Sequence, residues 1–503
     1  MRSTFMGLET SKRGLQTQQS ALYTTGHNID NANTLGYTRQ RVNMRATAGF
    51  PGVGLNAGTM PGFLGTGVEA GSIQRIRDSF VDQQYRGETN KLGYWDARSK
   101  SIGQIEDIMN EPSEYGLQKS LSQFWGSLQD LATHPENGGA RKVVVERGIA
   151  VADSFNYMNK SLQELKTGTE TEINITVSQV NSILSQIAGL NDQISSIEPN
   201  GYLPNDLYDA RDVLIDQLAQ ILPIEMGKPI ESGGNAVKGI AEGAVVINIK
   251  TANGSIPLLS GKDAGQLSAN KTEDAINGDK IDSFSIASVG SIPVGTLKVS
   301  DMQADKGTLK SLVTTFGDGT DKALIPQMIK SLDKMANAFM KAFNDVHKDG
   351  YALGAATKST NDFFTGTGAG DMKVNGDISK DPSLIAASGE AGAEGNGDNA
   401  KKLGNIQFNK NGNLGGGTIQ TYFQGIIGQL GVDGEQAAKM QFNSETLLKS
   451  VENRRASISS VSLDEEMTDM IKFQQAYNAS ARMITVVDET LDKIINGMGV
   501  VGR

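Results

Sequence analysis

The stretch "NIDNANTLGYTRQR", residues 28–41, decides how the N-terminal part of the chain folds. It follows a run in which apolar residues recur every seven positions, at Leu8, Leu15, Leu22 and Ile29. Asparagine and aspartate side chains bond nearby backbone groups, and glycine permits positive φ, so the stretch favours a turn. The sequence therefore predicts a helix over about the first thirty residues that ends at this cluster.

The seam of this helix is only half apolar. The positions between the leucines are Phe5, Lys12, Gln19 and Gly26. A seam of this kind can pack on partner helices but cannot hold a helix on its own. We therefore expect the N-terminal helix to be completed by neighbouring helices.

The last forty residues repeat the pattern. Apolar positions at alternating spacings of four and three residues are Leu463, Met467, Met470, Tyr477, Ala481, Ile484, Leu491 and Ile495. Polar Gln474 and Asp488 fall on the same seam. Residues 1–41 contain five Lys/Arg and two Asp/Glu, whereas residues 463–503 contain four and seven. Opposite charge favours pairing of the two terminal helices, within a subunit or between subunits.

The half-polar seams also make a prediction for the isolated chain. We expect residues 1–40 and the last ~40 to be poorly protected there, with Ile484 exposed until neighbouring helices cover it. An ordinary two-helix contact within a monomer is the alternative.

Between the ends, helical periodicity covers 72–109, 117–131, 141–167 with 173–194, and 206–222, and Pro112 ends the first run. The pattern is compatible with 141–167 and 173–194 being one continuous helix or two. Residues 226–323 are rich in Gly, Ser, Asn and Thr and alternate like strands. The sequence predicts a mainly α fold with an inserted β domain: an elongated multidomain protein with coiled-coil-like terminal helices, a long helical bundle and a β-rich outer domain.

The predicted domain boundaries follow these changes in pattern. They are 1–40 with 462–503 for the terminal helices, 41–225 with 324–353 and 400–461 for the bundle, and 226–323 for the β-rich domain, with 354–399 as a candidate addition. We expect the β-rich domain to be an independent insertion whose ends lie close together and to be dispensable for assembly.

Composition excludes several classes of function. The net charge of −10 gives no reason to bind nucleic acid, and no apolar stretch is long enough for a membrane span. The chain has no cysteine, which removes disulfides and thiolate metal sites. Its first residues lack the apolar segment of a secretory signal, so we expect any export to occur without a cleaved signal peptide.

No constellation of catalytic residues is visible in the sequence. The histidines His27, His134 and His347 lack metal-pair spacing, and there is no GxSxG motif or P-loop. Gly65 and Gly67 belong to a formal GxGxxA, but it lies in a glycine-rich extended segment outside any βαβ unit. The sequence therefore predicts a protein that is not an enzyme, with no catalytic, cofactor-binding or metal-binding residues.

The opening stretch resembles a motif of bacterial flagellar axial proteins, N-I-x-N-A-N-T-P-G-Y. The matching residues are Asn28, Asn31, Ala32, Asn33, Thr34, Gly36 and Tyr37; Asp30 stands where Ala is usual and Leu35 where Pro is usual. The tail "VSLDEEMTDMIKFQQAYNASARMITVVDETLDKII" is similar to the C-terminal signature of rod, hook and hook-associated proteins. "DLYDARDVLIDQL", "AFNDVHKDGYALG" and "LLKSVENRRASISSVSLDEEM" resemble the hook-associated protein 1 family.

This resemblance implies a structural subunit of the extracellular flagellum that forms the junction between hook and filament and templates filament attachment. The alternatives are another axial protein, of hook or filament type, and a secreted enzyme carried on axial-protein termini. The implied partners are further copies of the chain in a ring or helical lattice, the hook subunit and a second hook-associated junction protein. A cytoplasmic export chaperone on the C-terminal helix and the flagellar type III export apparatus are also implied.

Overall fold

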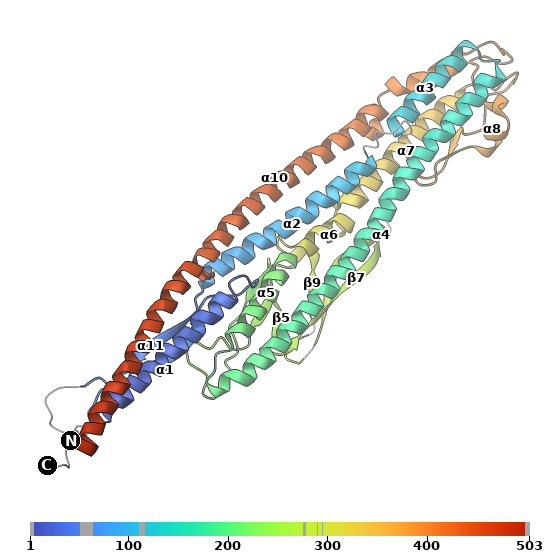
Figure 1. The fold of residues 1–503 in the computed structure, drawn as a ribbon. Helices are drawn as coiled ribbons and strands as arrows, with labels where there is room; N and C mark the ends of the chain where they lie inside the picture. The colour runs from blue at the N-terminus through green and yellow to red at the C-terminus, as the bar shows by residue number, and fades with distance from the viewer. Residues whose placement is uncertain are drawn as a thin grey trace.

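The computed structural model describes residues 5–50, 64–109, 116–274, 278–288, 290–293 and 295–497. Long helices run side by side along an elongated molecule, and the first and last helices lie together at one end (Figure 1). This arrangement confirms the predicted fold class of an elongated, mainly helical protein with a smaller β-rich region.

The helices account for most of the chain. Their bounds are α1 Met6–Asp30, α2 Ser79–Met109, α3 Leu117–Thr133, α4 Gly138–Ile197, α5 Asn205–Ile221, α6 Thr308–Phe316, α7 Leu324–Asp349, α8 Gly376–Lys380, α9 Asp398–Asn405, α10 Ile419–Ser459 and α11 Leu463–Asp492. The two helical patterns after residue 141 form one helix of 60 residues, α4, which is capped at its start by the Asn137 side chain. In the described part of the chain, none of these helices is long and apolar enough to span a membrane.

The strands form four small antiparallel sheets. β1 Gln40–Ala46 pairs with β2 Val68–Arg75, and β10 Phe364–Thr365 pairs with β11 Lys373–Val374. A four-stranded sheet has the order β3 Ile224–Met226, β4 Val246–Thr251, β5 Gly254–Ser260 and β6 Asp263–Ala264. A three-stranded sheet consists of β7 Gln266–Asp274, β8 Gly278–Ala287 and β9 Gly295–Lys298.

One helix begins later than its pattern predicts. Residues 72–75 belong to β2, where Ile73 pairs with Val42 of β1, and α2 starts only at Ser79. The Asp78 carboxylate accepts a hydrogen bond from the Phe80 backbone N–H at 2.9 Å and so caps the new helix. Pro112 and most of the glycine-rich segment, at 51–63, lie outside the described residues.

The end of the molecule remote from α1 and α11 has an aromatic core. Phe124, Phe155, Phe339, Phe343 and Phe363 are completely buried there and pack ring against ring. They come from α3, α4, α7 and the loop after α7. The segment 354–399, which the sequence offers as an addition to the β-rich domain, also supplies Phe364 and Met372 to this core.

The β-rich segment has no core of its own. Ile173 and Leu184 of α4 and Ile215 of α5 lie in one buried cluster with Phe284 of β8 and Phe316 of α6. The strands therefore need α4 and α5 to bury their inner faces, because a sheet stabilises itself only when its apolar face is covered. Removing residues 226–323 would leave these helices with an exposed apolar face, which speaks against the expected independence of this segment.

Candidate functional site

The terminal helices α1 and α11 pack against each other in antiparallel orientation (Figure 1). A side-chain carbon on Gly7 would lie 3.7 Å from Val487 Cγ2, and one on Gly14 would lie 3.3 Å from Ser480 Oγ. Asn28 bonds Glu466 directly at 3.0 Å. Each step of seven residues along α1 is thus matched by seven residues backward along α11, which is the register of a heptad pair.

Gly7, Gly14 and Asn28 of α1 lie against α11, each one position before a residue of the predicted seam. The same seven-residue step includes Ala21, which is 1% exposed. The predicted residues Leu8, Leu15, Leu22 and Ile29 are half-buried beside these positions. Small residues let two helix backbones approach closely, and the larger leucines flank the contact instead of filling it.

The predicted seam of α11 is divided between two faces. Met470, Tyr477, Ala481, Ile484 and Leu491 are half-buried, whereas Leu463, Met467 and Ile495 are exposed. Both ends are therefore ordered helices in the single chain, and Ile484 is partly covered. The predicted pairing of the terminal helices occurs within one chain, which was the alternative of an ordinary two-helix contact. The expected exposure of Ile484 in the single chain is wrong, because the contact with α1 half-buries it, and poor protection of the ends stays a prediction.

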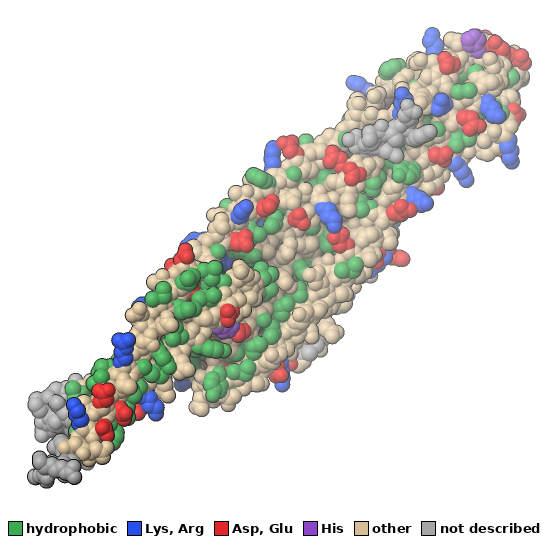
Figure 2. Space-filling model, in the orientation of Figure 1, with side chains coloured by type: hydrophobic (Ala, Val, Ile, Leu, Met, Phe, Trp, Pro, Cys, Tyr) green, Lys and Arg blue, Asp and Glu red, His purple; other side chains and the backbone are tan. Residues whose placement is uncertain are grey.

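Exposed apolar side chains remain on α11 and just after it, and together they are called the outer row. They form two groups, Leu463, Met467 and Ile471 near the start of α11, and Met483, Val486 and Ile494 at least twelve residues further along; all six are 48–57% exposed. Figure 2 shows hydrophobic side chains gathered over the end of the molecule that carries α1 and α11. Large exposed apolar side chains gathered at one end of a molecule are typical of a contact with another protein.

Asn28 is the polar centre where the terminal pair meets the rest of the chain. Its Nδ2 donates to the Gln40 carbonyl oxygen at 2.8 Å and to Glu466 Oε2 at 3.0 Å. Its Oδ1 accepts from the Tyr37 hydroxyl at 2.8 Å and from the Gln40 N–H at 3.0 Å. All four hydrogen bonds that an asparagine side chain can make are present in a residue only 1% exposed.

The other residues of the motif shape the turn around Asn28. Asn31 Nδ2 donates to the His27 carbonyl at the end of α1, and Thr34 Oγ1 donates to Asn31 Oδ1. Gly36 has φ +79°, and a side chain there would collide with Val213 of α5. Ala32 is half-buried and Asn33 is exposed. Burial, followed by nearby carboxylates, raises the pKa of Tyr37, so its hydroxyl stays protonated and remains a donor to Asn28.

Arg39 joins the turn after α1 to the corner between α10 and α11. Its Nε donates to Glu466 and its Nη1 to Glu465, each at 2.6 Å. Its backbone N–H donates to the carbonyl of Ser459 at the end of α10. The first residues after α1 therefore hold the start of α11 in place from two directions.

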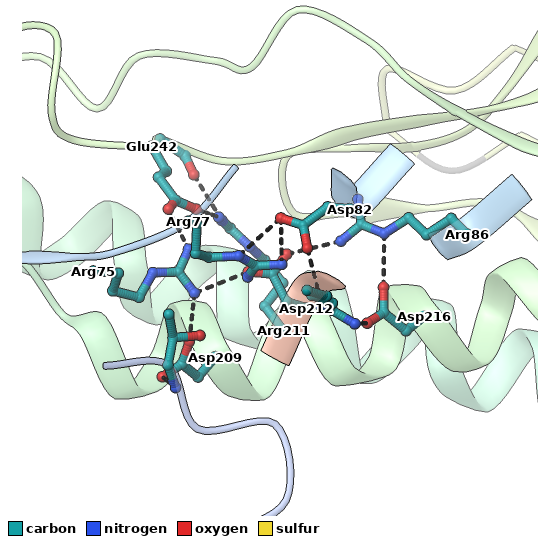
Figure 3. A network of polar contacts seen from close by, with 12 residues as sticks. Arg75, Arg77, Asp82, Arg86, Asp209, Arg211, Asp212, Asp216 and Glu242 are labelled. Carbon is teal, nitrogen blue, oxygen red and sulfur yellow. Dashed lines mark hydrogen bonds and ion pairs between the residues drawn. The ribbon is translucent and has the colours of Figure 1, made fainter. Parts of the chain in front are cut away.

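A buried network of arginines and carboxylates lies next to this turn (Figure 3). α5 presents Asp209, Asp212 and Asp216 on one face, at spacings of three and four residues. Arg75 of β2 pairs with Asp209 at 2.6 Å and with Asp212 at 2.9 Å, and Arg86 of α2 pairs with Asp216 at 2.7 Å. The side chain of Arg75 is only 4% exposed.

The network reaches the start of α2 and the end of α10. Arg77 pairs with Asp212 and, at 2.8 Å, with Asp82 near the start of α2. Arg455 of α10 pairs with Asp82 at 2.8 Å and with Asp216 at 2.7 Å. The network thus holds β2, α2, α5 and α10 together at the point where the terminal helices join the rest of the molecule.

The central carboxylate of the network, Asp212, is held in its charged form. Burial alone would raise the pKa of Asp212, but the guanidinium groups of Arg77, Arg75 and Arg86 lower it below its usual range. A buried carboxylate held ionised by several arginines is a structural group, because it neither gains nor loses a proton near neutral pH. We call the Asn28 centre, Arg39 and this network together the polar joint.

The sequence contained only part of the signal for the polar joint. The carboxylates of "DLYDARDVLIDQL" have the spacing of one helix face, which predicts a shared partner. Their partners Arg75, Arg77, Arg86 and Arg455 come from other parts of the chain, and no local pattern connects them. Across the described ranges, no group of three or more His, Cys, Asp or Glu side chains could hold a metal ion.

Comparisons with known proteins agree with this arrangement. Residues 102–364 match the model of the flagellar hook-associated protein FlgK helical domain, and residues 454–497 match that of the flagellar basal body rod FlgEFG protein C-terminal region. Flagellar hook-associated protein 1 of Bacillus subtilis (strain 168) is 43% identical over the full length of both chains. That of Escherichia coli (strain K12) is 24% identical over 97% of this chain and 99% of its own.

A solved structure shares the fold. The flagellar hook junction protein FlgK from Burkholderia pseudomallei superposes with a TM-score of 0.57 at 13% sequence identity. The match covers 75% of this chain and 100% of the solved one.

Proposed function

The chain belongs to the family of flagellar hook-associated protein 1, and from that premise we propose how its two ends and its polar joint build a junction. The protein is a structural component of the extracellular flagellum at the junction between hook and filament. It associates with other hook and rod components of that structure.

In our proposal the pair of α1 and α11 forms the wall of an inner tube, and the outer row of α11 packs against neighbouring copies in a ring or helical lattice. The observation that carries this proposal is the outer row itself, with six large apolar side chains about half exposed on the last helix. Burying one such side chain fully contributes roughly 1.5–3 kcal/mol, which a single chain forgoes and an assembly gains.

The polar joint would fix how the outer domains are held on that tube. Asn28 sets the register of α1 on α11 through Glu466, and Arg39 fixes the corner between α10 and α11. Buried polar residues that fix helix register are well known in coiled coils, because any slip leaves them without partners. In this proposal, the residues of the family motif fix the position of the terminal helices at the base of the outer domains.

The remaining partners follow from the same surface. Before assembly the outer row would need cover, which supports an export chaperone on the C-terminal helix and passage through the flagellar type III apparatus. After assembly, neighbouring positions would be taken by the hook subunit on one side and by a second hook-associated junction protein on the other. In this role the protein templates filament attachment and carries out no catalysis.

Charge in the outer row tests the proposal. Ile471→Asp changes a side chain that is 57% exposed, so the purified subunit should keep its unfolding temperature. In the assembly the same aspartate would be buried without a partner, at a cost of several kcal/mol per copy. Cells with the variant should therefore export the subunit, lack filaments and shed unpolymerised flagellin into the medium.

Ile175→Asp is the matched control, because Ile175 is 63% exposed on α4 and lies away from the terminal helices. It should leave filaments intact. Normal filaments on cells carrying Ile471→Asp would mean that the outer row does not join subunits. If the variant accumulates inside the cell, a defect of export rather than of assembly is indicated, and chaperone binding should be measured directly.

A further inference from the structure

Strand β3 is an edge strand with one open side. Among the strands of the described residues it pairs only with β4, and the sheet continues from β4 to β5 and β6. The N–H of Gly227 donates to Val246, and the N–H of Lys250 donates to the carbonyl of Pro223. Because antiparallel strands alternate, the backbone groups of Ile224 and Met226 must point away from β4.

The open side of β3 lies along a groove. The cavity has a volume of about 860 Å³, and its walls are β3 on one side and the first turns of α2, including Phe80 and Gln83, on the other. Met226 and Phe80 are 39% and 58% exposed. An exposed strand edge beside an open, partly apolar groove is the geometry used for adding an extended peptide to a sheet.

The groove carries positive charge that the chain does not neutralise. Arg75, Arg77 and Arg86 also line it, but they are paired within the polar joint. Lys250 and Lys306 line it as well, and Lys306 Nζ donates to Oε1 of the uncharged Gln303 at 2.7 Å. Burial, with Lys250 and Lys91 nearby, lowers the pKa of Lys306.

Carboxylates oppose these lysines only in part. Asp82, Asp212 and Glu242 also line the groove, but they are paired with the arginines. Glu225 lines it on the alternate face of β3 from Ile224 and Met226, and Glu88, which pairs with Lys91 at 2.8 Å, lies near Lys306. Beside the paired network, Lys91, Lys250 and Lys306 thus face Glu88 and Glu225, a small positive excess in a chain of net charge −10. This excess complements an acidic ligand.

We propose that β3 and this groove form a docking site for an extended acidic segment of a partner protein. The segment adds as a strand to β3, exchanging hydrogen bonds with the outward N–H and C=O groups of Ile224 and Met226. Its apolar side chains lie on Met226 and Phe80, and its carboxylates meet Lys250 and Lys306. The site lies beside the polar joint, apart from the outer row that joins copies in the proposed tube.

The test uses the full-length subunit and a short synthetic peptide that alternates valine with glutamate. Titration calorimetry should detect binding, and amide exchange at Ile224 and Met226 should slow at least about tenfold when the peptide is bound. A peptide with lysine in place of glutamate should bind at least about tenfold more weakly, because its charge opposes that of the groove.

Two variants and a control separate the backbone contact from the charge. Met226→Pro removes an outward N–H that β4 does not use, so the sheet should persist while peptide binding is lost. Lys250→Glu should weaken peptide binding about tenfold. Lys402→Glu makes the same charge change at an exposed position of α9 and should leave peptide binding unchanged. The Lys250→Glu variant keeps the test valid if Met226→Pro does not fold.

Several outcomes would overturn the proposal. They are absence of binding, equal binding of the glutamate and lysine peptides, and unchanged exchange at Ile224 and Met226. Self-association of the subunit that is lost in Met226→Pro would also overturn it, because the edge would then be occupied by a second copy.

Discussion

The aromatic core and the terminal helix pair use opposite ways of holding helices together. In the core, Phe124, Phe339, Phe343 and Phe363 are fully buried and in ring-to-ring contact. In the terminal pair, the residues in closest approach are glycines, an alanine and an asparagine, and the only buried side chain of α11 is that of Glu466. Of the large apolar side chains of α11, Met470, Tyr477, Ile484 and Leu491 are only half-buried, and Leu463, Met467, Ile471, Met483 and Val486 are about half exposed.

This difference indicates where each part obtains its stability. The core is fully packed within one chain, so it stabilises the isolated subunit without contacts to other copies. The terminal pair has register and order from its small residues and from the polar joint, but little buried apolar area. In the proposed assembly, most of its stabilisation would come from other copies of the chain.

The largest effect should come from opening a cavity in the core. Phe339→Ala removes a ring in contact with Phe124, Phe155 and Phe364 and should lower the free energy of unfolding of the isolated subunit by about 3–5 kcal/mol. Phe408→Ala, at a position 70% exposed, should change it by less than about 0.5 kcal/mol. Denaturant unfolding of both variants measures these changes. A small loss of unfolding free energy in Phe339→Ala would mean that the core is not what stabilises the subunit.

A somewhat smaller effect should follow from acid. His347 is fully buried at the end of α7, where Nδ1 bonds the carbonyl oxygen of Asn361 and Nε2 accepts from the N–H of Ala386. Burial lowers the pKa of His347 to about 4, against 6.5 in the unfolded chain. The unfolded state therefore binds the proton more readily, and stability falls as the pH drops from 6.5 towards 4.

The size of this loss is about 3 kcal/mol over that window, and none is expected above it. His347→Gln should lack this share of the pH dependence, which urea titrations at a series of pH values can measure. Identical pH profiles for the variant and the original protein would show that His347 does not couple folding to pH.

The sequence predicted most of what depends on local periodicity. The helices, their long lengths and the pairing of the two ends follow from spacing and charge, which act between residues close in the chain or on entire segments. The face of α1 in the pair was not predictable in this way. A search for apolar residues at heptad spacing places Leu8, Leu15 and Leu22 on the contact face of α1. Close packing of two helices instead favours the small residues Gly7, Gly14 and Ala21 there.

Only the carboxylates of the polar joint could be recognised from the sequence. The spacing of Asp209, Asp212 and Asp216 is a local pattern, but Arg75 and Arg455 come from segments more than a hundred residues away in either direction. The shared core of the strands with α4 and α5 was missed for the same reason. Alternation identifies a strand's inner face, and it does not identify what covers that face.

The most direct test of the division between core and terminal pair is native-state amide exchange on the isolated subunit, with and without Asn28→Ala. We predict that α1 and α11 exchange through a local opening well below the global free energy of unfolding, while α4 and α7 exchange only on global unfolding. Asn28→Ala should lower the local opening by about 1–3 kcal/mol, because Glu466 and Tyr37 lose a buried partner, and should leave α7 unchanged. Protection of α1 and α11 equal to that of α7, or an equal loss in both regions, would contradict this account.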